Sequence, residues 1–139
     1  MERLYYLSHW LYCHKVPVLP RIIMLVIRLF YQSYIPYKTR IGPGVSFGHA
    51  IGVVLAPRSV IGAHCTIRHH VTVADGKGGG ARIGDEVEIG AGAFILNNLT
   101  IGSRVRIGAN AVVVQDVPDD ATVVGNPGRV VSIKGKQVT

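Results

Sequence analysis

A six-residue repeat constrains the fold of this chain more than any other feature of its sequence. An aliphatic residue followed by glycine recurs in step, as in Ile61-Gly62, Ile83-Gly84, Ile89-Gly90, Ile101-Gly102 and Ile107-Gly108. A repeat of this period is typical of a parallel β-helix, in which each short strand buries its apolar face only by stacking on the next coil. The sequence therefore predicts an all-β fold, a parallel β-helix that begins near Ile41.

A second apolar position accompanies the repeat, four residues after each aliphatic one. Its residues are mostly small: Val45, Ile51, Cys65, Val71, Val87, Ala93, Leu99, Val105, Ala111 and Val117. Hydrophobic residues make up 48% of the chain but aromatic ones only 7%, so the core must be filled by small aliphatic side chains. We expect both positions of the repeat to point inward.

Two departures from the six-residue step predict loops. Three hexapeptides make one triangular coil of about 18 residues. The step is eight between Val53 and Ile61 and ten between Val73 and Ile83. Extra residues in a stacked coil must bulge outward, so we expect a short first loop and a longer second loop over residues 75–82.

The segment before the repeats reads as two short helices. Residues 2–15 and 20–34 are separated by Val16-Pro17-Val18-Leu19-Pro20, whose prolines interrupt a helix. The expected organisation is a helical segment over residues 1–36, a β-helix over 37–118 and a C-terminal cap over 119–139. The apolar run Ile22–Tyr31 contains Arg28 and is shorter than the roughly 20 residues that span a bilayer.

The helices also carry a hypothesis about a membrane surface. Apolar side chains, among them Trp10, Leu25 and Phe30, occur beside Arg21 and Arg28, a composition that suits an anionic membrane face. Packing of the same side chains on the β-helix or on a neighbouring copy of the chain is the alternative.

Charge and cysteine content narrow the class of partners. The formal net charge is +7, but no four basic residues are consecutive and no aromatic residues alternate with them, so nucleic acid is not an expected partner. Cys13 and Cys65 form no CxxC motif, and no signal peptide with a cleavage site precedes them. We expect a reduced, cytoplasmic protein.

One column of the predicted prism carries the residues with catalytic chemistry. The column begins at Phe47, Ile67, Ile89 and Ile107, and two residues later stand His49, His69, Ala91 and Ala109. Imidazole serves as a general base near neutral pH, and the alanines would floor a groove that accepts an extended cofactor chain. This arrangement favours acyl transfer, with His49 and His69 as candidate catalytic residues.

Other candidate residues have alternatives. Arg106 and Arg129 are candidates for the phosphates of a nucleotide cofactor, and solvated surface charge is the alternative. Asp75, Lys77 and Arg82 belong to the second loop, which we expect on the acceptor side. The loop is not a P-loop, because no Ser or Thr follows Lys77 and no helix begins there. No third ligand accompanies His69 and His70 at metal-binding spacing, so no metal is expected.

The repeat region resembles the serine acetyltransferase branch of the hexapeptide acyltransferases. The resemblance runs from Ile41 to about Val131 and rests on the segments 45–54, 67–73, 89–93, 107–113 and 124–131. It implies a left-handed parallel β-helix, a homotrimer, and acetyl-CoA bound between adjacent subunits as co-substrate. It further implies that His49 is the general base and that the backbone at Ala91 and Ala109 contacts the CoA arm.

Three departures from that branch bear on the acceptor. Tyr34 and Gly48 stand where the serine-specific enzymes carry aspartates, and their Asp-Arg-His-Pro run is absent because Gly80-Ala81-Arg82 leads straight into Ile83. A zwitterionic acceptor needs paired charges, so the prediction is an O-acetyltransferase acting on a sugar or glycan hydroxyl, as in polysaccharide synthesis. Serine O-acetyltransferase and a non-catalytic β-helix scaffold are the alternatives.

Overall fold

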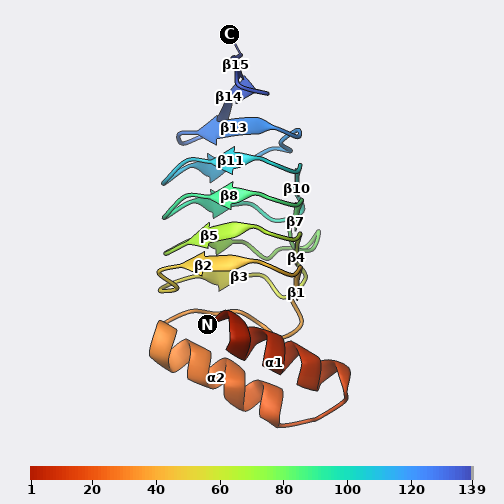
Figure 1. The fold of residues 1–139 in the computed structure, drawn as a ribbon. Helices are drawn as coiled ribbons and strands as arrows, with labels where there is room; N and C mark the ends of the chain where they lie inside the picture. The colour runs from red at the N-terminus through yellow and green to blue at the C-terminus, as the bar shows by residue number, and fades with distance from the viewer. Residues whose placement is uncertain (139) are drawn as a thin grey trace.

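The computed structural model describes residues 1–138 and shows two helices followed by a stack of β-coils (Figure 1). The helices α1 (Glu2–Cys13) and α2 (Leu19–Tyr31) lie at one end of the stack, and the C-terminus lies at the other. The prediction of a left-handed parallel β-helix with a short N-terminal two-helix segment is confirmed.

Three parallel sheets form the faces of the prism. Sheet 1 contains β1 (Arg40–Ile41), β4 (Val60–Ile61), β7 (Arg82–Ile83) and β10 (Thr100–Ile101). Sheet 2 contains β2 (Ser46–Gly48), β5 (Thr66–Arg68), β8 (Glu88–Ile89), β11 (Arg106–Ile107) and β13 (Ala121–Val124). Sheet 3 contains β3 (Val54–Leu55), β6 (Thr72–Val73), β9 (Phe94–Ile95) and β12 (Val112–Val113).

The repeat residues stack in register inside the prism. Phe47 pairs with Ile67, Ile67 with Ile89 and Ile89 with Ile107, and all four side chains are buried. The other two sheets bury equivalent aliphatic ladders. The small residues of the second position, such as Cys65 and Ala93, are also fully buried. Burial raises the pKa of the Cys65 thiol, which fits a core residue.

The first insertion lies elsewhere than the spacing predicts. Gly48 pairs with Arg68 and Val54 pairs with Thr72, so the two extra residues fall between Gly48 and Val54 and not between Val53 and Ile61. Ile51, predicted to point inward, is instead 50% exposed. Val53 and Leu55 are both apolar and both fully buried, so the sequence alone could not show which of them begins the next strand.

The helices are shorter than predicted, and α1 closes the first coil. Helix α1 ends at Cys13, and α2 begins at Leu19, because Pro20 fits the first turn of a helix. Glu2 accepts a hydrogen bond from the backbone N–H of Phe47 at 3.0 Å, and this bond lowers the pKa of Glu2. The hydroxyls of Tyr5 and Tyr6 donate to the carbonyls of Thr39 and Gly42. The helix therefore supplies hydrogen-bond partners to backbone groups at the edge of the first coil, which would otherwise be unpaired.

The opposite end of the stack is closed by antiparallel pairing. Strand β13 still stacks on β11 in parallel, with Ile107 opposite Val123. The chain then turns back through β14 (Arg129–Ile133) and β15 (Lys136–Gln137), which pair antiparallel. The strand pairing of sheet 2 thus changes direction at its last coil.

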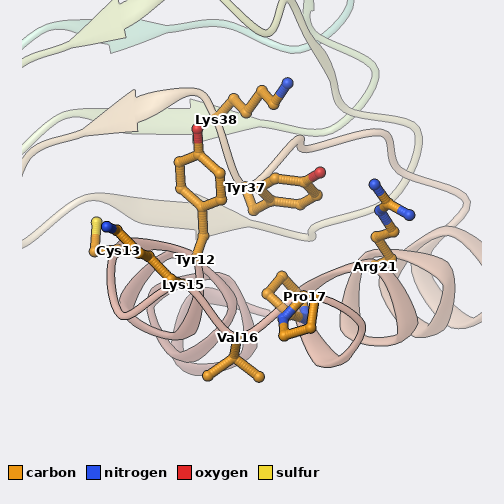
Figure 2. Close-up of a pocket in the computed structure, with 9 residues that line it drawn as sticks. Tyr12, Cys13, Lys15, Val16, Pro17, Arg21, Tyr37 and Lys38 are labelled. Carbon is orange, nitrogen blue, oxygen red and sulfur yellow. The ribbon is translucent and has the colours of Figure 1, made fainter.

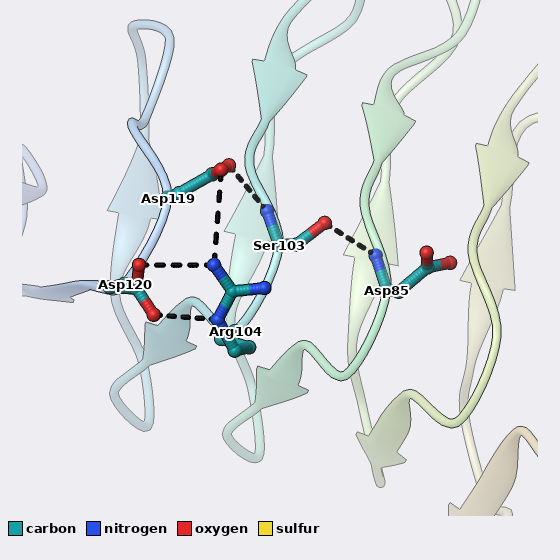
Figure 3. Close-up of polar contacts among 5 residues, drawn as sticks. All are labelled: Asp85, Ser103, Arg104, Asp119 and Asp120. Atoms are coloured by element: carbon teal, nitrogen blue, oxygen red, sulfur yellow. Dashed lines mark hydrogen bonds and ion pairs between the residues drawn. The ribbon is translucent and has the colours of Figure 1, made fainter.

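A polar network links successive coils at one corner (Figure 3). The backbone N–H of Asp85 donates to the hydroxyl of Ser103 at 3.1 Å, and the N–H of Ser103 donates to Asp119 at 2.9 Å. Arg104 donates two hydrogen bonds to Asp120, at 2.7 and 3.1 Å. These bonds lower the pKa of Asp120.

Replacing the buried Ile67 by alanine should destabilise the stack. Ile67 is fully buried, and deleting such a side chain costs about 2–5 kcal/mol because a cavity remains. Urea unfolding followed by circular dichroism measures the loss. In the control Val114→Ala, at a side chain that is 42% exposed, the free energy of unfolding should change by less than about 0.5 kcal/mol. Equal losses in the two variants would contradict the register.

Replacing Arg104 by glutamine should raise the pKa of Asp120 toward its ordinary value of 3.8. NMR titration of the carboxyl carbon measures the pKa. Because the folded-state pKa is depressed, the pair stabilises the fold above the unfolded-state pKa, and this contribution is lost as the pH falls through the folded-state pKa. The difference in Tm between parent and variant should therefore shrink in acid. Arg106→Gln should leave the pKa of Asp120 unchanged.

Candidate functional site

The predicted column of site residues forms one corner of the prism, between sheets 2 and 3. We call it the histidine corner and define it by His49, His69, Ala91 and Ala109. Each of these residues follows a strand of sheet 2, and the strands pair in unbroken parallel register. The corner therefore brings together the two predicted catalytic residues and the two alanines predicted to meet the cofactor.

His49 stands in the bulge made by the two extra residues. Its φ is 54°, in the left-handed region, and the N–H of Ile51 donates to its carbonyl at 2.6 Å. This tight turn keeps the His49 side chain exposed. Among residues 1–138, the backbone N–H groups of His49 and Ala50 have no hydrogen-bond acceptor. The bulge thus offers an imidazole and free backbone donors in one place.

His69 lies beside His49. The two ring centroids are 6.3 Å apart with an interplanar angle of 72°. His69 is half-buried, and its Nδ1 is buried without a hydrogen-bond partner among the residues that the structure describes. A buried polar atom of this kind is costly to leave unpaired, so a polar group of a bound molecule would be stabilised next to it.

The alanines keep the rest of the corner flat. Ala91 is half-buried and Ala109 is exposed. A Cβ placed on Gly90 would come within 2.5 Å of the backbone nitrogen of Ala109, so the coils approach here more closely than a side chain allows. A surface made of backbone and methyl groups suits a long, slender ligand lying across it.

The two predicted phosphate-binding arginines lie near the same sheet. Arg106 is on β11, directly before the corner, is 71% exposed and lies 3.9 Å from Glu88. Arg129 is exposed and pairs with Val124 where β14 turns back on β13. Arg104 lies at a different corner and is engaged by Asp120.

The structure does not bring the predicted substrate-loop residues to the histidine corner. Asp75, Lys77 and Arg82 are exposed and lie at the corner between sheets 3 and 1. Asp75 is 3.6 Å from Arg58, which also donates to the carbonyl of Gly76 at 3.3 Å. Within one chain, the loop and His49 therefore occupy different corners.

Two cavities lie outside the predicted site. One, of about 550 Å³, is bounded by the turn between the helices and by Tyr37 and Lys38, and Tyr12 and Arg21 also line it (Figure 2). The other, of about 420 Å³, lies under the glycine run of the second loop. Sequence reasoning singled out Arg82 of the second cavity but missed the cations around it, Lys38, Arg40 and Arg58, because they come together only once the coils are in register.

Tyr34 and the two helices are further parts of the chain that the sequence singles out. Tyr34 pairs through its backbone with Val54, and no hydrogen bond joins its side chain to His49 within residues 1–138. The outer faces of α1 and α2 expose Trp10, Leu29 and Phe30. None of the helices within residues 1–138 is long and apolar enough to cross a membrane, and contact with a membrane surface stays a prediction.

The described residues contain no cluster of three or more His, Cys, Asp or Glu side chains that could hold a metal ion. His69 and His70 are neighbours, with ring centroids 5.6 Å apart. Two imidazoles alone do not make a metal site.

Sequence comparison identifies the repeat and its relatives. Residues 80–115 match the family model "Bacterial transferase hexapeptide (six repeats)". The chain is 42% identical to a serine acetyltransferase of Synechococcus elongatus, over 94% of this chain and 55% of that protein. It is also 42% identical to the serine acetyltransferase of Staphylococcus xylosus, over 95% of this chain and 63% of the relative. The chain thus spans little more than half the length of the first relative.

Solved structures give the same result. A serine acetyltransferase in complex with CoA matches with a TM-score of 0.86 and 35% identity, over 92% of this chain and 54% of the other. The Neisseria gonorrhoeae serine acetyltransferase in complex with serine matches with a TM-score of 0.84 and 37% identity, over 91% and 53% of the two chains.

These comparisons contradict the predicted sugar or glycan acceptor and its role in polysaccharide synthesis. All four proteins are serine acetyltransferases. The prediction relied on Tyr34, Gly48 and the shortened second loop. It gave three local departures more weight than a match over nearly the whole chain, and it is wrong.

The repeat, the fold and the relatives agree with one another. The six-residue period extends over all three sheets, and the matched structures cover more than nine-tenths of the chain. The chain therefore belongs to the hexapeptide-repeat acyltransferase family, in the branch that is similar to the serine acetyltransferases.

Proposed function

We propose that this chain is a serine O-acetyltransferase, which transfers the acetyl group of acetyl-CoA to the hydroxyl of L-serine and works as a homotrimer in the cytoplasm. The observation that carries the proposal is the histidine corner, in which an exposed imidazole stands at one end of a flat column of small residues. The relatives that match over most of the chain are serine acetyltransferases, and one matched structure is a complex with CoA.

His49 would act as the general base. Its imidazole would take the proton of the serine hydroxyl while the oxygen attacks the thioester carbonyl of acetyl-CoA. The bond from carbon to sulfur then breaks, and the CoA thiolate takes up a proton from the imidazolium. The free N–H groups of His49 and Ala50 would be the donors that stabilise the oxyanion. His69, with its unpaired Nδ1, would bind a polar group of the bound substrates.

The CoA arm would lie along Ala91 and Ala109, with its phosphates toward Arg106 and Arg129. Ala91 and Ala109 follow β8 and β11, adjacent strands of sheet 2, and Arg106 precedes Ala109 by three residues. Arg129 would come from β14, where it pairs with Val124 at the end of the same sheet.

In the proposed trimer, a neighbouring subunit would supply the residues that contact serine. Asp75, Lys77 and Arg82 lie at a different corner from His49 in the same chain. If these loop residues contact serine, they must come from a neighbouring copy. We therefore propose that each site combines the histidine corner of one subunit with the second loop of the next.

We expect the purified protein to release free thiol from acetyl-CoA in the presence of L-serine, and His49→Ala to lower the rate by about 10²–10⁴-fold, the usual contribution of a general base. A thiol-reactive dye measures the release. His64→Ala is the control, because His64 is also exposed with a positive φ but lies at another corner; it should keep the parent rate. A folded protein that binds acetyl-CoA but releases no thiol with serine would refute the proposal.

His49→Gly should remain folded. The left-handed conformation costs a side-chain-bearing residue about 1–2 kcal/mol, and glycine adopts it freely at the expense of a more flexible unfolded state. The free energy of unfolding should therefore stay within about 1 kcal/mol of the parent, whereas the β-branched His49→Val should be clearly less stable. Urea unfolding measures both. A large destabilisation by glycine would contradict the described turn at His49.

A further inference from the structure

Helix α2 is apolar on two sides, and the rest of the chain covers only one of them. The inner side is buried and includes Ile23 and Ile27. The outer side carries a row of exposed aliphatic side chains at helical spacing, which we call the outer stripe: Val18, Ile22, Leu25 and Leu29. A helix that is apolar on both sides is expected to be covered on both. Within residues 1–138 the outer stripe lacks that cover.

The exposed apolar surface extends beyond the outer stripe. Leu29 and Phe30 are 68% and 79% exposed, and Leu19 is exposed as well. The two helices form the end of the molecule that lies opposite the C-terminus (Figure 1). Single exposed apolar side chains are ordinary in proteins, but a contiguous group of them marks a contact surface. The outer stripe is therefore a candidate docking surface.

Cationic side chains border the outer stripe. Leu25 comes four residues after Arg21 and three before Arg28, so both arginines are its neighbours on the helix surface. Both are exposed. Glu2 is the only carboxylate in residues 1–74, and it accepts the hydrogen bond from the backbone N–H of Phe47. The helical end of the molecule therefore has an excess of positive charge next to its apolar surface.

A cavity with cationic walls adjoins the start of α2. Its volume is about 550 Å³, and Lys15, Arg21 and Lys38 are among its lining residues (Figure 2). No carboxylate lines this cavity among residues 1–138. Guanidinium and ammonium groups are common partners of phosphate. Because Arg21 belongs both to the cavity and to the border of the outer stripe, a phosphate held there would lie beside apolar side chains.

We propose that the outer stripe docks on the surface of a membrane that contains anionic phospholipids. Ile22, Leu25 and Leu29 would enter the boundary between headgroups and acyl chains, while Arg21 and Arg28 would contact lipid phosphates. A second copy of the chain is a poorer occupant, because it would bring the same arginines together with no free carboxylate on either helix. Docking goes beyond the proposed acetyl transfer, since these residues belong neither to the histidine corner nor to the second loop.

Co-sedimentation of the full chain with vesicles tests the proposal. We expect at least about fivefold more protein to sediment with equal parts of phosphatidylglycerol and phosphatidylcholine than with phosphatidylcholine alone, because the surface is both apolar and cationic. Leu25→Gln combined with Leu29→Gln should abolish most of this binding. Val114→Gln is the matched control, because Val114 is also exposed and lies outside the helices; it should sediment as the parent does.

The cations are tested in the same way. Arg21→Gln combined with Arg28→Gln should lower binding to the mixed vesicles at least about threefold and leave the weak binding to phosphatidylcholine unchanged. Lys136→Gln, at an exposed cation on β15, is the matched control. Circular dichroism establishes that each variant is folded. Sedimentation needs neither acetyl-CoA nor serine, and all these variants should keep the parent rate of thiol release, so the outcome is independent of the acetyl-transfer proposal.

A tryptophan placed in the outer stripe reports the contact directly. Trp10 is the only tryptophan of the chain, so Trp10→Phe combined with Leu25→Trp leaves one indole, within the stripe. Its emission should shift to shorter wavelengths when mixed vesicles are added, because the ring leaves water. Trp10→Phe combined with Val114→Trp is the control and should show no shift.

Two results would overturn the proposal. One is equal sedimentation of the parent with the two kinds of vesicle, or an emission of the Leu25→Trp variant that mixed vesicles leave unchanged. The other is light scattering, without vesicles, in which the particle mass of the parent is halved by Leu25→Gln combined with Leu29→Gln. That result would assign the outer stripe to a contact between copies of this chain.

Discussion

The hydrogen bonds between successive coils are the interaction on which the rest of this structure depends. Each strand from β1 to β12 pairs in parallel with the equivalent strand one coil away, so Phe47, Ile67, Ile89 and Ile107 form one ladder. The same pairing aligns the corners, and residues distant in the sequence become neighbours in a column. The core and the histidine corner follow from this register, because the position of a residue within its coil decides where its side chain lies.

The features that follow from periodicity alone could be predicted from the sequence. The column of His49, His69, Ala91 and Ala109 needs only the count of residues between aliphatic positions, and the strand pairing confirms it. The location of the first insertion could not be predicted, because Val53 and Leu55 are equally apolar and both are buried. The cavity under the second loop could not be predicted either, because Lys38 and Arg58 come close to the predicted loop residue Arg82 only once the coils are in register.

The error about the acceptor has a physical reason. A substrate site is a small part of the surface, and a few changed positions suggest a change of substrate while the surrounding fold and most of the sequence are retained. The change of acceptor was inferred from the identity of Tyr34 and Gly48 alone. In the structure Tyr34 makes a backbone bridge to Val54 and does not bond to His49. Position in the sequence does not by itself show which groups face a ligand.

The stacking of a set number of coils between two covered ends decides the length of the histidine corner. Helix α1 covers the first coil through Glu2, Tyr5 and Tyr6, and at the other end β14 pairs antiparallel with β13. These contacts cover the first and the last coil of the stack. From His49 to Ala109 the histidine corner spans three coil steps of about 4.8 Å, or about 14 Å. The coil spacing therefore fixes the length of the histidine corner, and a ligand that contacts both His49 and Ala109 must extend over that length.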